Sequence, residues 1–461
     1  MSARLLSELA AATGGTLMGE DREFGRVTQD TRKLAAGELF VAIKGDNFDG
    51  HEFLVQAEKL GAAGALVERK RSVALSQVVV KDARKALGAY AAAWRRRFQL
   101  PLIGVTGSSG KTTLKEMLAS ILKQKGATLA TRGNMNNDIG MPLTLLELDA
   151  SDRYAVIEMG TNHPGEIEYL AKLAAPTVGV VTNAGPAHLE FLRDVAGVAR
   201  EKGAMFASLM AGGTAVINAD DTYAPLWREM AGARKVVTFG FSERADFHPS
   251  SAVLAQSDNG SWQFHLVSPF GETDVQVSLP GRHNVANALA AAAAAMSAGA
   301  SLEDVRAGVA QAPATAGRLI VIRGLNGCRL IDDTYNANPL SLTAAIEFAV
   351  SFGGSSWLVL GDMGELGGST VRLHAECGAR ARSLGIERLY AIGEHSRHAV
   401  EAFGSGASWF EDLNALLRTL RADASPDITL LVKGSRSMRM ERVVEALRQQ
   451  PAGNRAANGD H

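Results

Sequence analysis

The middle of the chain alternates apolar runs with helical stretches. This alternation predicts a mostly parallel, doubly wound sheet. Between 247 and 279 single polar and apolar residues alternate, in the runs 261–267 and 273–279, which predicts a small antiparallel extension of the same unit. The apolar runs that predict the parallel strands are 102–106, 154–159, 178–183, 214–219 and 235–241.

A further unit is predicted on each side of this one. Residues 1–98 mix helices, one of them amphipathic within the first 15 residues, with strand candidates at 38–45 and 77–82. The third unit has strand candidates at 329–333, 357–362, 388–393 and 428–434. For a chain of 461 residues we therefore expect an α/β protein with three domains. The predicted domains are 1–98, 99–318 and 319–448, followed by a disordered tail at 449–461.

Composition narrows the classes of partner and compartment. The formal net charge of −1 provides no bulk attraction to nucleic acid or to an anionic membrane. The two cysteines, Cys328 and Cys377, have no metal-ligand spacing and fit a reducing cytoplasm. The N-terminus lacks the basic and long apolar regions of a signal peptide, and the alanine-rich run 285–300 is too short for a membrane span. We expect a cytoplasmic protein that neither binds nucleic acid nor inserts into a membrane.

The strongest local signal is the segment LIGVTGSSGKTTLKEMLASIL, in which an apolar strand leads through a small-residue loop into a helix. Backbone N–H groups of such a loop surround phosphate oxygens. Lys111 would neutralise β/γ-phosphate charge, and the Thr112 hydroxyl would bind Mg²⁺. A strict phosphate-loop pattern needs glycine where Val105 stands, so a plain strand–turn–helix connection is the alternative. The predicted ATP-binding loop comprises Gly107, Ser108, Ser109, Gly110, Lys111, Thr112 and Thr113.

Three further residues are candidates for metal binding or catalysis. Glu158 ends a predicted strand, where ligands collect in nucleotide-binding α/β sheets, although a lone carboxylate there can be a satisfied edge group. His188 follows the next strand, and Lys202 lies in a helical context. A single residue of any of these three kinds is more often structural or solvated. Because a phosphate loop lies upstream, Glu158 becomes a candidate Mg²⁺ ligand.

Seven segments taken together resemble the Mur ligase family of peptidoglycan synthesis. The segments are GVTGSSGKTT, GNMNNDIGMPLTLL, VIEMGTNHPGEI, NAGPAHLEFL, LPGRHNVANALAA, DDTYNANPLSL and LVKGSR, in order over nearly the whole chain. The resemblance implies a UDP-sugar domain, a central ATPase domain and a C-terminal Rossmann-like domain. DDTYNANPLSLTAAI and LGDMGELG look most like the branch that adds D-alanyl-D-alanine. That branch joins D-alanyl-D-alanine to UDP-N-acetylmuramoyl-tripeptide, with ATP, through an acyl phosphate.

The resemblance also implies residue roles. Lys111 and Thr112 match the phosphate loop, Glu158 a first-metal ligand and His188 a second-metal ligand, for two Mg²⁺ ions in all. Lys202 matches a lysine that the family carbamylates, and Lys111, His188 and Lys202 form the expected catalytic set. Residues expected to hold the nucleotide are Asn287, Arg318 and Asp333. Residues expected to face the substrates are Thr31, Arg32, Lys44, Asn134, Asn137, Asp138, Tyr335, Asn338, Lys433, Ser435 and Arg436.

Other functions stay open from the sequence. Another Mur-type amino-acid ligase would share most of these segments. A ligase like folylpolyglutamate synthase would share the loop and the carbamylated lysine, although such enzymes usually begin almost directly with the ATPase unit. A nucleotide-binding switch would leave His188 and Lys202 without a role. We expect a monomeric ligase of the Mur type.

Overall fold

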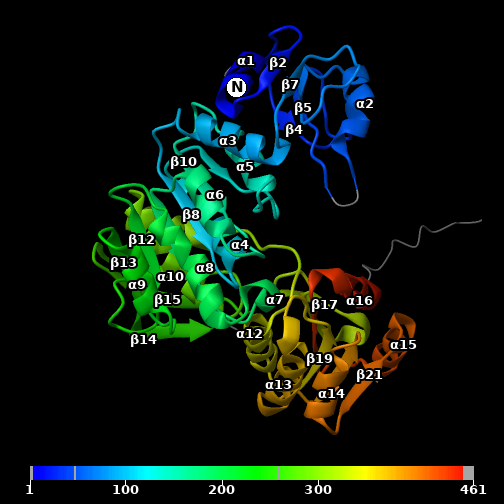
Figure 1. The fold of residues 1–461 in the computed structure, drawn as a ribbon. Coiled ribbons are helices and arrows are strands. Elements are labelled where there is room, and N and C mark those ends of the chain that lie inside the picture. Colours follow the sequence, from blue (N-terminus) through cyan, green and yellow to red (C-terminus); the bar gives the residue numbers. More distant parts are fainter. Residues whose placement is uncertain (1–3, 46–47, 257–259, 450–461) are drawn as a thin grey trace, which may run out of the picture.

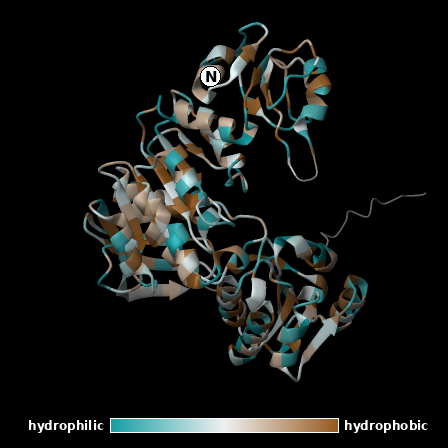
Figure 2. Cartoon of the chain, in the orientation of Figure 1, coloured by the Kyte–Doolittle hydropathy of each residue, from teal (hydrophilic) through white to brown (hydrophobic). Residues whose placement is uncertain are grey.

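The computed structural model describes residues 4–45, 48–256 and 260–449, which form three α/β units (Figure 1). The α/β class and the mostly parallel sheets agree with the sequence prediction. Apolar residues gather in the strands and on the inner faces of the helices, and polar residues cover the outside (Figure 2). The three predicted domain boundaries stay predictions.

The central unit is built on a six-stranded parallel sheet of order β13-β12-β11-β8-β10-β9. Successive side chains of a strand point to opposite faces, and each face has its own core. Ile103 and Val105 pack with the layer of α4, α10 and α11, whereas Leu102 packs with the layer of α3, α5 and α6. The sheet is therefore doubly wound, as predicted. Its strands are β8 (Leu102–Thr106), β9 (Thr128–Ala130), β10 (Tyr154–Glu158), β11 (Val178–Val181), β12 (Thr214–Asn218) and β13 (Lys235–Phe239), and its helices are α4 (Lys111–Lys123), α5 (Gly140–Leu145), α6 (Glu166–Ala174), α7 (Leu189–Leu192), α8 (Val195–Ala207), α9 (Ala224–Ala231), α10 (Arg282–Ser297) and α11 (Leu302–Ala310).

The predicted antiparallel extension is present as a sheet of order β14-β15-β16. Its strands are β14 (His248–Gln256), β15 (Trp262–Ser268) and β16 (Gly271–Val277). Phe264, Leu266, Val275 and Val277 are buried against the α4 and α10 layer. Residues 285–297 of the alanine-rich run belong to α10 (Arg282–Ser297), and residues 298–300 follow its end.

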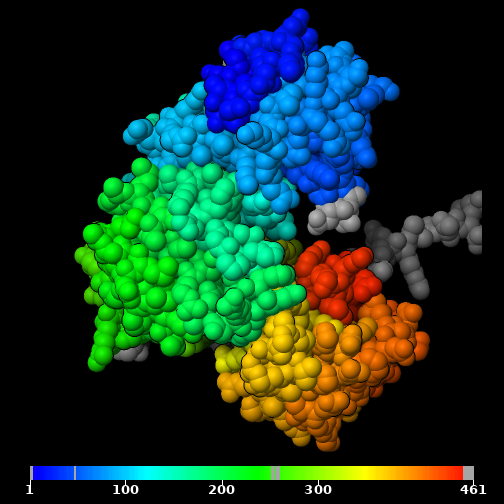
Figure 3. All heavy atoms as spheres, viewed as in Figure 1, coloured from blue at the N-terminus to red at the C-terminus, as the bar shows by residue number. Residues whose placement is uncertain are grey.

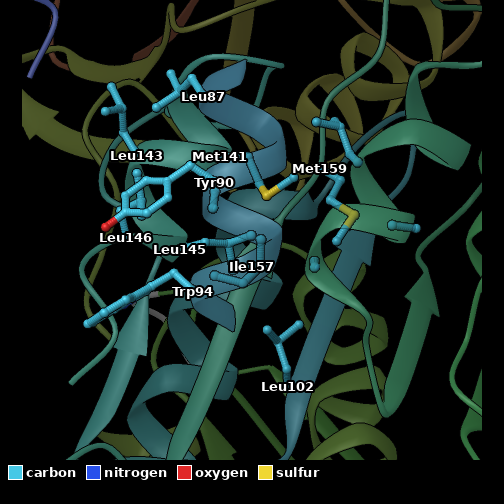
Figure 4. Close-up of a cluster of buried hydrophobic side chains, with 14 of the residues drawn as sticks. Leu87, Tyr90, Trp94, Leu102, Met141, Leu143, Leu145, Leu146, Ile157 and Met159 are labelled. Atoms are coloured by element: carbon cyan, nitrogen blue, oxygen red, sulfur yellow. The ribbon is translucent and has the colours of Figure 1, made fainter. Parts of the chain in front are cut away.

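The N-terminal unit has a five-stranded sheet of order β2-β7-β6-β5-β4 and a two-stranded pair, β1-β3. Helix α3 connects it to the central unit by packing on α1, α5 and α6. Tyr90 and Trp94 of α3 share one apolar cluster with Met141 and Ile157 (Figure 4). The two units are therefore joined by a continuous core. The elements are β1 (Arg4–Leu5), α1 (Leu6–Thr13), β2 (Thr16–Met18), β3 (Glu23–Phe24), β4 (Val27–Thr28), β5 (Leu39–Val41), α2 (Leu54–Lys59), β6 (Gly64–Val67), β7 (Gln77–Val79) and α3 (Ala83–Arg95).

The C-terminal unit has a six-stranded sheet of order β17-β18-β22-β19-β20-β21, in which only β17 is antiparallel to its neighbour. Two apolar clusters cover its faces. In Figure 3 this unit contacts the central unit along one side. Its strands are β17 (Ile320–Arg323), β18 (Arg329–Asp333), β19 (Ser355–Gly361), β20 (Arg388–Ile392), β21 (Ala407–Phe410) and β22 (Ile428–Lys433), and its helices are α12 (Pro339–Val350), α13 (Thr370–Ser383), α14 (Arg397–Phe403), α15 (Leu413–Asp423) and α16 (Glu441–Leu447).

Several expectations concern the ends and the surroundings of the chain. The predicted disordered tail lies outside the described residues, except for Gln449, whose N–H donates to the Arg323 carbonyl at 3.1 Å. Within the described part, none of the helices has both the length and the apolar character of a membrane span. Both cysteines are buried as free thiols.

Candidate active site

The phosphate loop lies between β8 and α4, and its shape depends on two glycines. Gly107 has a φ of 150° and Gly110 a φ of 83°, where side chains are disfavoured. A Cβ on Gly107 would lie 1.7 Å from the Thr182 Oγ1, and one on Gly110 would lie 2.6 Å from the Asn287 Oδ1. The loop therefore passes so close to β11 and α10 that only glycine fits at these two positions.

Residues that follow β11 hold this loop in place. The Thr182 hydroxyl donates to the Ser109 carbonyl at 2.6 Å, and the Ser109 N–H donates to the Asn183 Oδ1 at 3.0 Å. The Ser108 N–H donates to the Asn183 carbonyl at 3.1 Å. These two loop N–H groups are already bonded, so the N-cap and first turn of α4, whose N–H groups lack acceptors within the helix, are the donors best placed for an anion.

Cationic side chains surround the same helix end. Burial lowers the pKa of Lys111, which Glu158 opposes and Arg318 reinforces. The Lys111 Nζ donates to the Gly107 carbonyl at 2.7 Å. The Lys202 side chain is 1% exposed, and its pKa is lowered well below the ordinary value by burial and then by the charge of Lys111. Burial likewise lowers the pKa of His188, to which the charges of Lys202 and Lys111 contribute. The three predicted catalytic residues thus lie within electrostatic range of one another.

Glu158, at the end of β10, is buried beside this cationic group. Its Oε1 accepts a hydrogen bond from the Asn136 Nδ2 at 2.8 Å, whereas its Oε2 is buried without a hydrogen-bond partner. A buried carboxylate oxygen without a donor is unfavourable unless a cation or water meets it. Glu158 therefore has one oxygen held by the protein and one available to a metal ion.

The asparagine-rich loop before α5 differs from its expected role. Asn136, which the sequence analysis did not select, is the loop residue that contacts Glu158. Asn137 instead accepts from the N–H groups of Ile139 and Gly140 at the start of α5, and Asp138 lies 3.3 Å from the Arg84 guanidinium. Asn134 is exposed. The contacts of these three residues are thus local or with α3, and their substrate roles stay predictions.

The segment between the central and C-terminal units reaches back to the phosphate loop. The Arg318 Nη2 donates to the Thr112 Oγ1 at 3.0 Å, and its guanidinium lies 4.4 Å over the Tyr335 ring. The Arg318 Nε is buried without a partner. Asn287 of α10 donates to the Asn284 Oδ1 at 2.9 Å and lies against Gly110. Asn287 and Arg318 therefore adjoin the phosphate loop, and Tyr335 adjoins Arg318; their binding roles stay predictions.

Helix α12 and β18 place further predicted residues at this junction. The Asn338 side chain caps α12 by accepting from the Ser341 N–H at 2.8 Å, and its Nδ2 donates to the Ser109 Oγ at 3.2 Å. The Lys433 ammonium pairs with Asp333, which also accepts from the Leu319 N–H at 3.2 Å. Asp333 and Lys433 are both buried, so each charge is neutralised by the other.

Ser435 and Arg436 follow β22. The Ser435 N–H donates to the Asp362 carbonyl at 2.9 Å, and Arg436 lies 3.4 Å from the carboxylate of Glu441. Arg436 is exposed. Ser435 is thus held by the residue that follows β19, and the exposed Arg436 has an ion-pair partner in α16.

His188 precedes α7 and contacts the C-terminal unit. Its Nδ1 is hydrogen-bonded to Glu365, which follows β19. An ionised carboxylate can only accept, so this contact assigns a proton to Nδ1; in the neutral ring, which the lowered pKa favours, Nε2 then keeps its lone pair. This partner, 177 positions away, was not predicted.

The predicted residues of the N-terminal unit lie apart from this cluster. The Thr31 hydroxyl donates to the Gln56 Oε1 at 3.3 Å, and Arg32 pairs with Asp30 at 2.8 Å. Lys44 is exposed. The partners of Thr31 and Arg32 lie within the N-terminal unit, which fits a second binding region or plain surface residues.

Comparison with known proteins gives the family. Residues 23–100 match the Mur ligase family catalytic domain, residues 105–295 the Mur ligase middle domain, and residues 317–436 the Mur ligase glutamate ligase domain. The chain is 44% identical over 446 residues to the UDP-N-acetylmuramoyl-tripeptide–D-alanyl-D-alanine ligase of Escherichia coli. The matched region covers 96% of this chain and 98% of the Escherichia coli chain. The chain belongs to the Mur ligase family.

Solved structures of Mur ligases share the fold. A crystal structure of MurF from Acinetobacter baumannii matches with a TM-score of 0.91 at 36% identity, over 96% of this chain and 98% of that chain. MurF from Thermotoga maritima, solved in complex with ADP, matches with a TM-score of 0.81 at 29% identity, over 91% and 96%. The predicted family and three-domain Mur ligase fold are thereby confirmed.

Within this Mur ligase the residues available for a metal ion are few. The described residues contain no group of three or more His, Cys, Asp or Glu side chains that could hold one. Mg²⁺ usually needs only one or two carboxylates besides phosphate oxygens and water. Glu158, with its unpartnered oxygen, and the Thr112 hydroxyl meet that smaller requirement.

Proposed function

We propose that this Mur ligase joins D-alanyl-D-alanine to UDP-N-acetylmuramoyl-tripeptide in an ATP-dependent reaction that yields ADP and phosphate. The observation that carries the proposal is the 44% identity, over nearly the full length of both chains, to the Escherichia coli ligase of that name. ATP as the nucleotide is supported by the ADP complex of the Thermotoga maritima relative and by the phosphate loop of this chain. The product is the pentapeptide precursor of peptidoglycan.

In this proposal the first turn of α4 binds the β- and γ-phosphates. The helix N-terminus supplies N–H donors and a positive dipole end, and Lys111 supplies a full charge beside it. Lys111 would leave the Gly107 carbonyl and reach the phosphate. Asn287, Arg318 and Asp333 would hold the rest of the nucleotide. The protein contributes to catalysis by positioning the reactants and stabilising charge, which are the main contributions to phosphoryl transfer.

Two Mg²⁺ ions would complete this site. Thr112 and the free Oε2 of Glu158 would hold the first, and His188, through Nε2, would help to hold the second with Lys202. When bound, such ions neutralise charge on the transferring phosphoryl group.

Lys202 would act as a carbamate. Burial lowers the pKa of its amine well below the ordinary value, so the neutral form is more accessible than in an exposed lysine. The neutral amine is the form that adds CO₂, with release of one proton. The carbamate replaces a cation by oxygen ligands, which suit Mg²⁺ and relieve repulsion with Lys111.

The chemistry proceeds in two steps. The terminal carboxylate of the tripeptide attacks the γ-phosphorus of ATP, giving an acyl phosphate and ADP. The dipeptide amine then attacks the acyl carbon, a proton leaves the nitrogen, and the tetrahedral intermediate expels phosphate. Asn338 contacts Ser109 of the phosphate loop, so docking of the C-terminal unit brings its residues to the reacting groups.

The remaining predicted residues would bind the two substrates. Thr31, Arg32 and Lys44 would hold the UDP-sugar, away from the phosphate loop. The residues proposed to line the reaction cleft are Asn134, Asn137, Asp138, Tyr335, Asn338, Lys433, Ser435 and Arg436. A monomeric state and a cytoplasmic location stay predictions.

Phosphate release tests this assignment. With ATP and UDP-N-acetylmuramoyl-tripeptide present, D-alanyl-D-alanine should be a far better acceptor than D-alanine, L-alanine or D-glutamate. Equal or faster release with a single amino acid would assign the chain to another Mur-type branch. Release that needs a pterin substrate and glutamate instead would favour the folylpolyglutamate-synthase type.

A further inference from the structure

Helix α7 and the loop after β19 belong to different units but are packed tightly together. Leu189 and Leu192 of α7 are at most 7% exposed and lie in the same apolar cluster as Met363 and Leu366. The Glu190 N–H donates to the Glu365 carbonyl at 3.2 Å. The short segment that carries His188 is thus docked on the C-terminal unit by both its backbone and its side chains.

The approach of the two backbones is close enough to need a glycine. Gly367 has a φ of 54°, and a Cβ there would lie 2.8 Å from the Glu190 Cα. His188 and Glu365 also have left-handed backbones, with φ of 56° and 60°. Such conformations cost about 1 kcal/mol or more for residues other than glycine and tend to persist at functional sites. Both partners of the His188–Glu365 hydrogen bond are therefore held in strained conformations by their surroundings.

The loop that carries Glu365 is itself rigidly held. The Asp362 Oδ1 accepts from the N–H groups of His395 and Ser396, at 3.1 and 2.7 Å. The Met363 N–H donates to the Nε2 of the fully buried His374 at 3.0 Å, and the Nδ1 of that ring donates to the Thr370 carbonyl. Glu365 therefore projects from a loop whose backbone has little freedom.

We propose that Glu365 is a positioning residue of the ligase, which fixes the His188 ring so that Nε2 is free for the second Mg²⁺. This inference rests on the proposed function of His188. A carboxylate behind a ligating imidazole orients the ring and sets its tautomer. Because Glu365 lies on the C-terminal unit, metal affinity is coupled to docking of that unit on α7.

The test is a Mn²⁺ titration, followed by electron paramagnetic resonance, of the full-length protein with a non-hydrolysable ATP analogue. Variants are Glu365→Gln, His188→Ala and the double variant. Glu365→Gln should weaken one Mn²⁺ site by about 10–100-fold and leave the other unchanged. The control is Glu411→Gln, which removes an exposed carboxylate beyond the far edge strand β21 and should bind as wild type.

The double variant separates positioning from a general structural effect. If Glu365 acts through His188, the double variant should bind Mn²⁺ no more weakly than His188→Ala alone. Additive losses, or wild-type Mn²⁺ affinity in Glu365→Gln beside a weakened His188→Ala, would overturn the role of Glu365. Wild-type affinity in His188→Ala would instead refute the proposed metal role of His188. The turnover rates of the variants should follow the order of their Mn²⁺ affinities, with kcat lowered and the KM for ATP little changed.

Discussion

Replacing Lys202 by methionine should make the protein more stable while it abolishes activity. Lys202 is 1% exposed, and burial lowers the pKa of its amine well below the ordinary value, so its surroundings disfavour the charged form. Methionine keeps the shape of the stem and removes the buried polar group. Stability and function should therefore change in opposite directions at this position.

The magnitude follows from two opposing effects. Burying a polar group whose surroundings solvate it poorly costs about 1–3 kcal/mol, and its removal returns that amount. Methionine is one heavy atom shorter, and a cavity of about 20 Å³ costs about 0.5 kcal/mol. The net gain in the free energy of unfolding is about 0.5–2.5 kcal/mol, or about 1–10 °C for a domain of 150–250 residues.

The gain depends on pH in a defined direction. In the folded protein the pKa of Lys202 lies well below the ordinary value of 10.5. At a pH between the lowered pKa of the folded protein and the ordinary pKa of the unfolded chain, the unfolded chain binds a proton at Lys202 and the folded chain does not. The free energy of unfolding of the wild type therefore rises with pH in this range. The difference in the free energy of unfolding between Lys202→Met and the wild type should thus be larger at neutral pH than the net gain given above. It should become smaller as the pH approaches 10.5.

Differential scanning calorimetry in CO₂-free buffer at two pH values measures the effect. The matched control is Lys235→Met, which changes an exposed lysine of β13 in the same unit and should stay within about 0.5 kcal/mol of wild type. Added bicarbonate should stabilise the wild type and leave Lys202→Met unchanged. A lower melting temperature of Lys202→Met in CO₂-free buffer, with Lys235→Met unaffected, would show that the amine has a stabilising partner and would refute the reasoning.

Three further outcomes are expected. Lys111→Ala should abolish phosphate release and keep a native circular dichroism spectrum, because its charge stands at the helix end that binds phosphate; normal turnover would contradict the nucleotide site. Lys202→Ala should be nearly inactive and be partly restored by acetate or formate, whereas Lys202→Arg should stay inactive; an active Lys202→Arg would contradict the carbamate. Gly107→Ala should lower kcat/KM for ATP by about 100-fold or more, since its Cβ would lie 1.7 Å from the Thr182 Oγ1; a wild-type KM in steady-state kinetics would show that the loop can shift.

The sequence was sufficient for features whose signal is local. The phosphate loop combines a strand, glycines at positions of positive φ and a lysine at a helix start, all within ten residues. The place of Glu158 at the end of a parallel strand was also predicted correctly, and that edge of the sheet is where ligands collect. Long buried strands such as β8 and β12 were also predicted close to their observed bounds.

Short strands at sheet edges were missed. The strands β9, β17 and β21, three or four residues long, lie at sheet edges, and none of them is fully buried. A strand that is not covered on both faces needs no continuous apolar run, so its sequence resembles a loop. Pairing with a neighbour, which depends on the tertiary structure, determines these elements.

Contacts between side chains distant in sequence were decided by the tertiary structure. Asn136 contacts Glu158, while its neighbours Asn134 and Asn137 do not, because the path of the loop determines which amide faces β10. Similarly, the residues Thr182 and Glu365 gain their contacts from loops of other strands. Local sequence specifies which chemical groups a segment carries, but the packing of three sheets determines which of those groups meet.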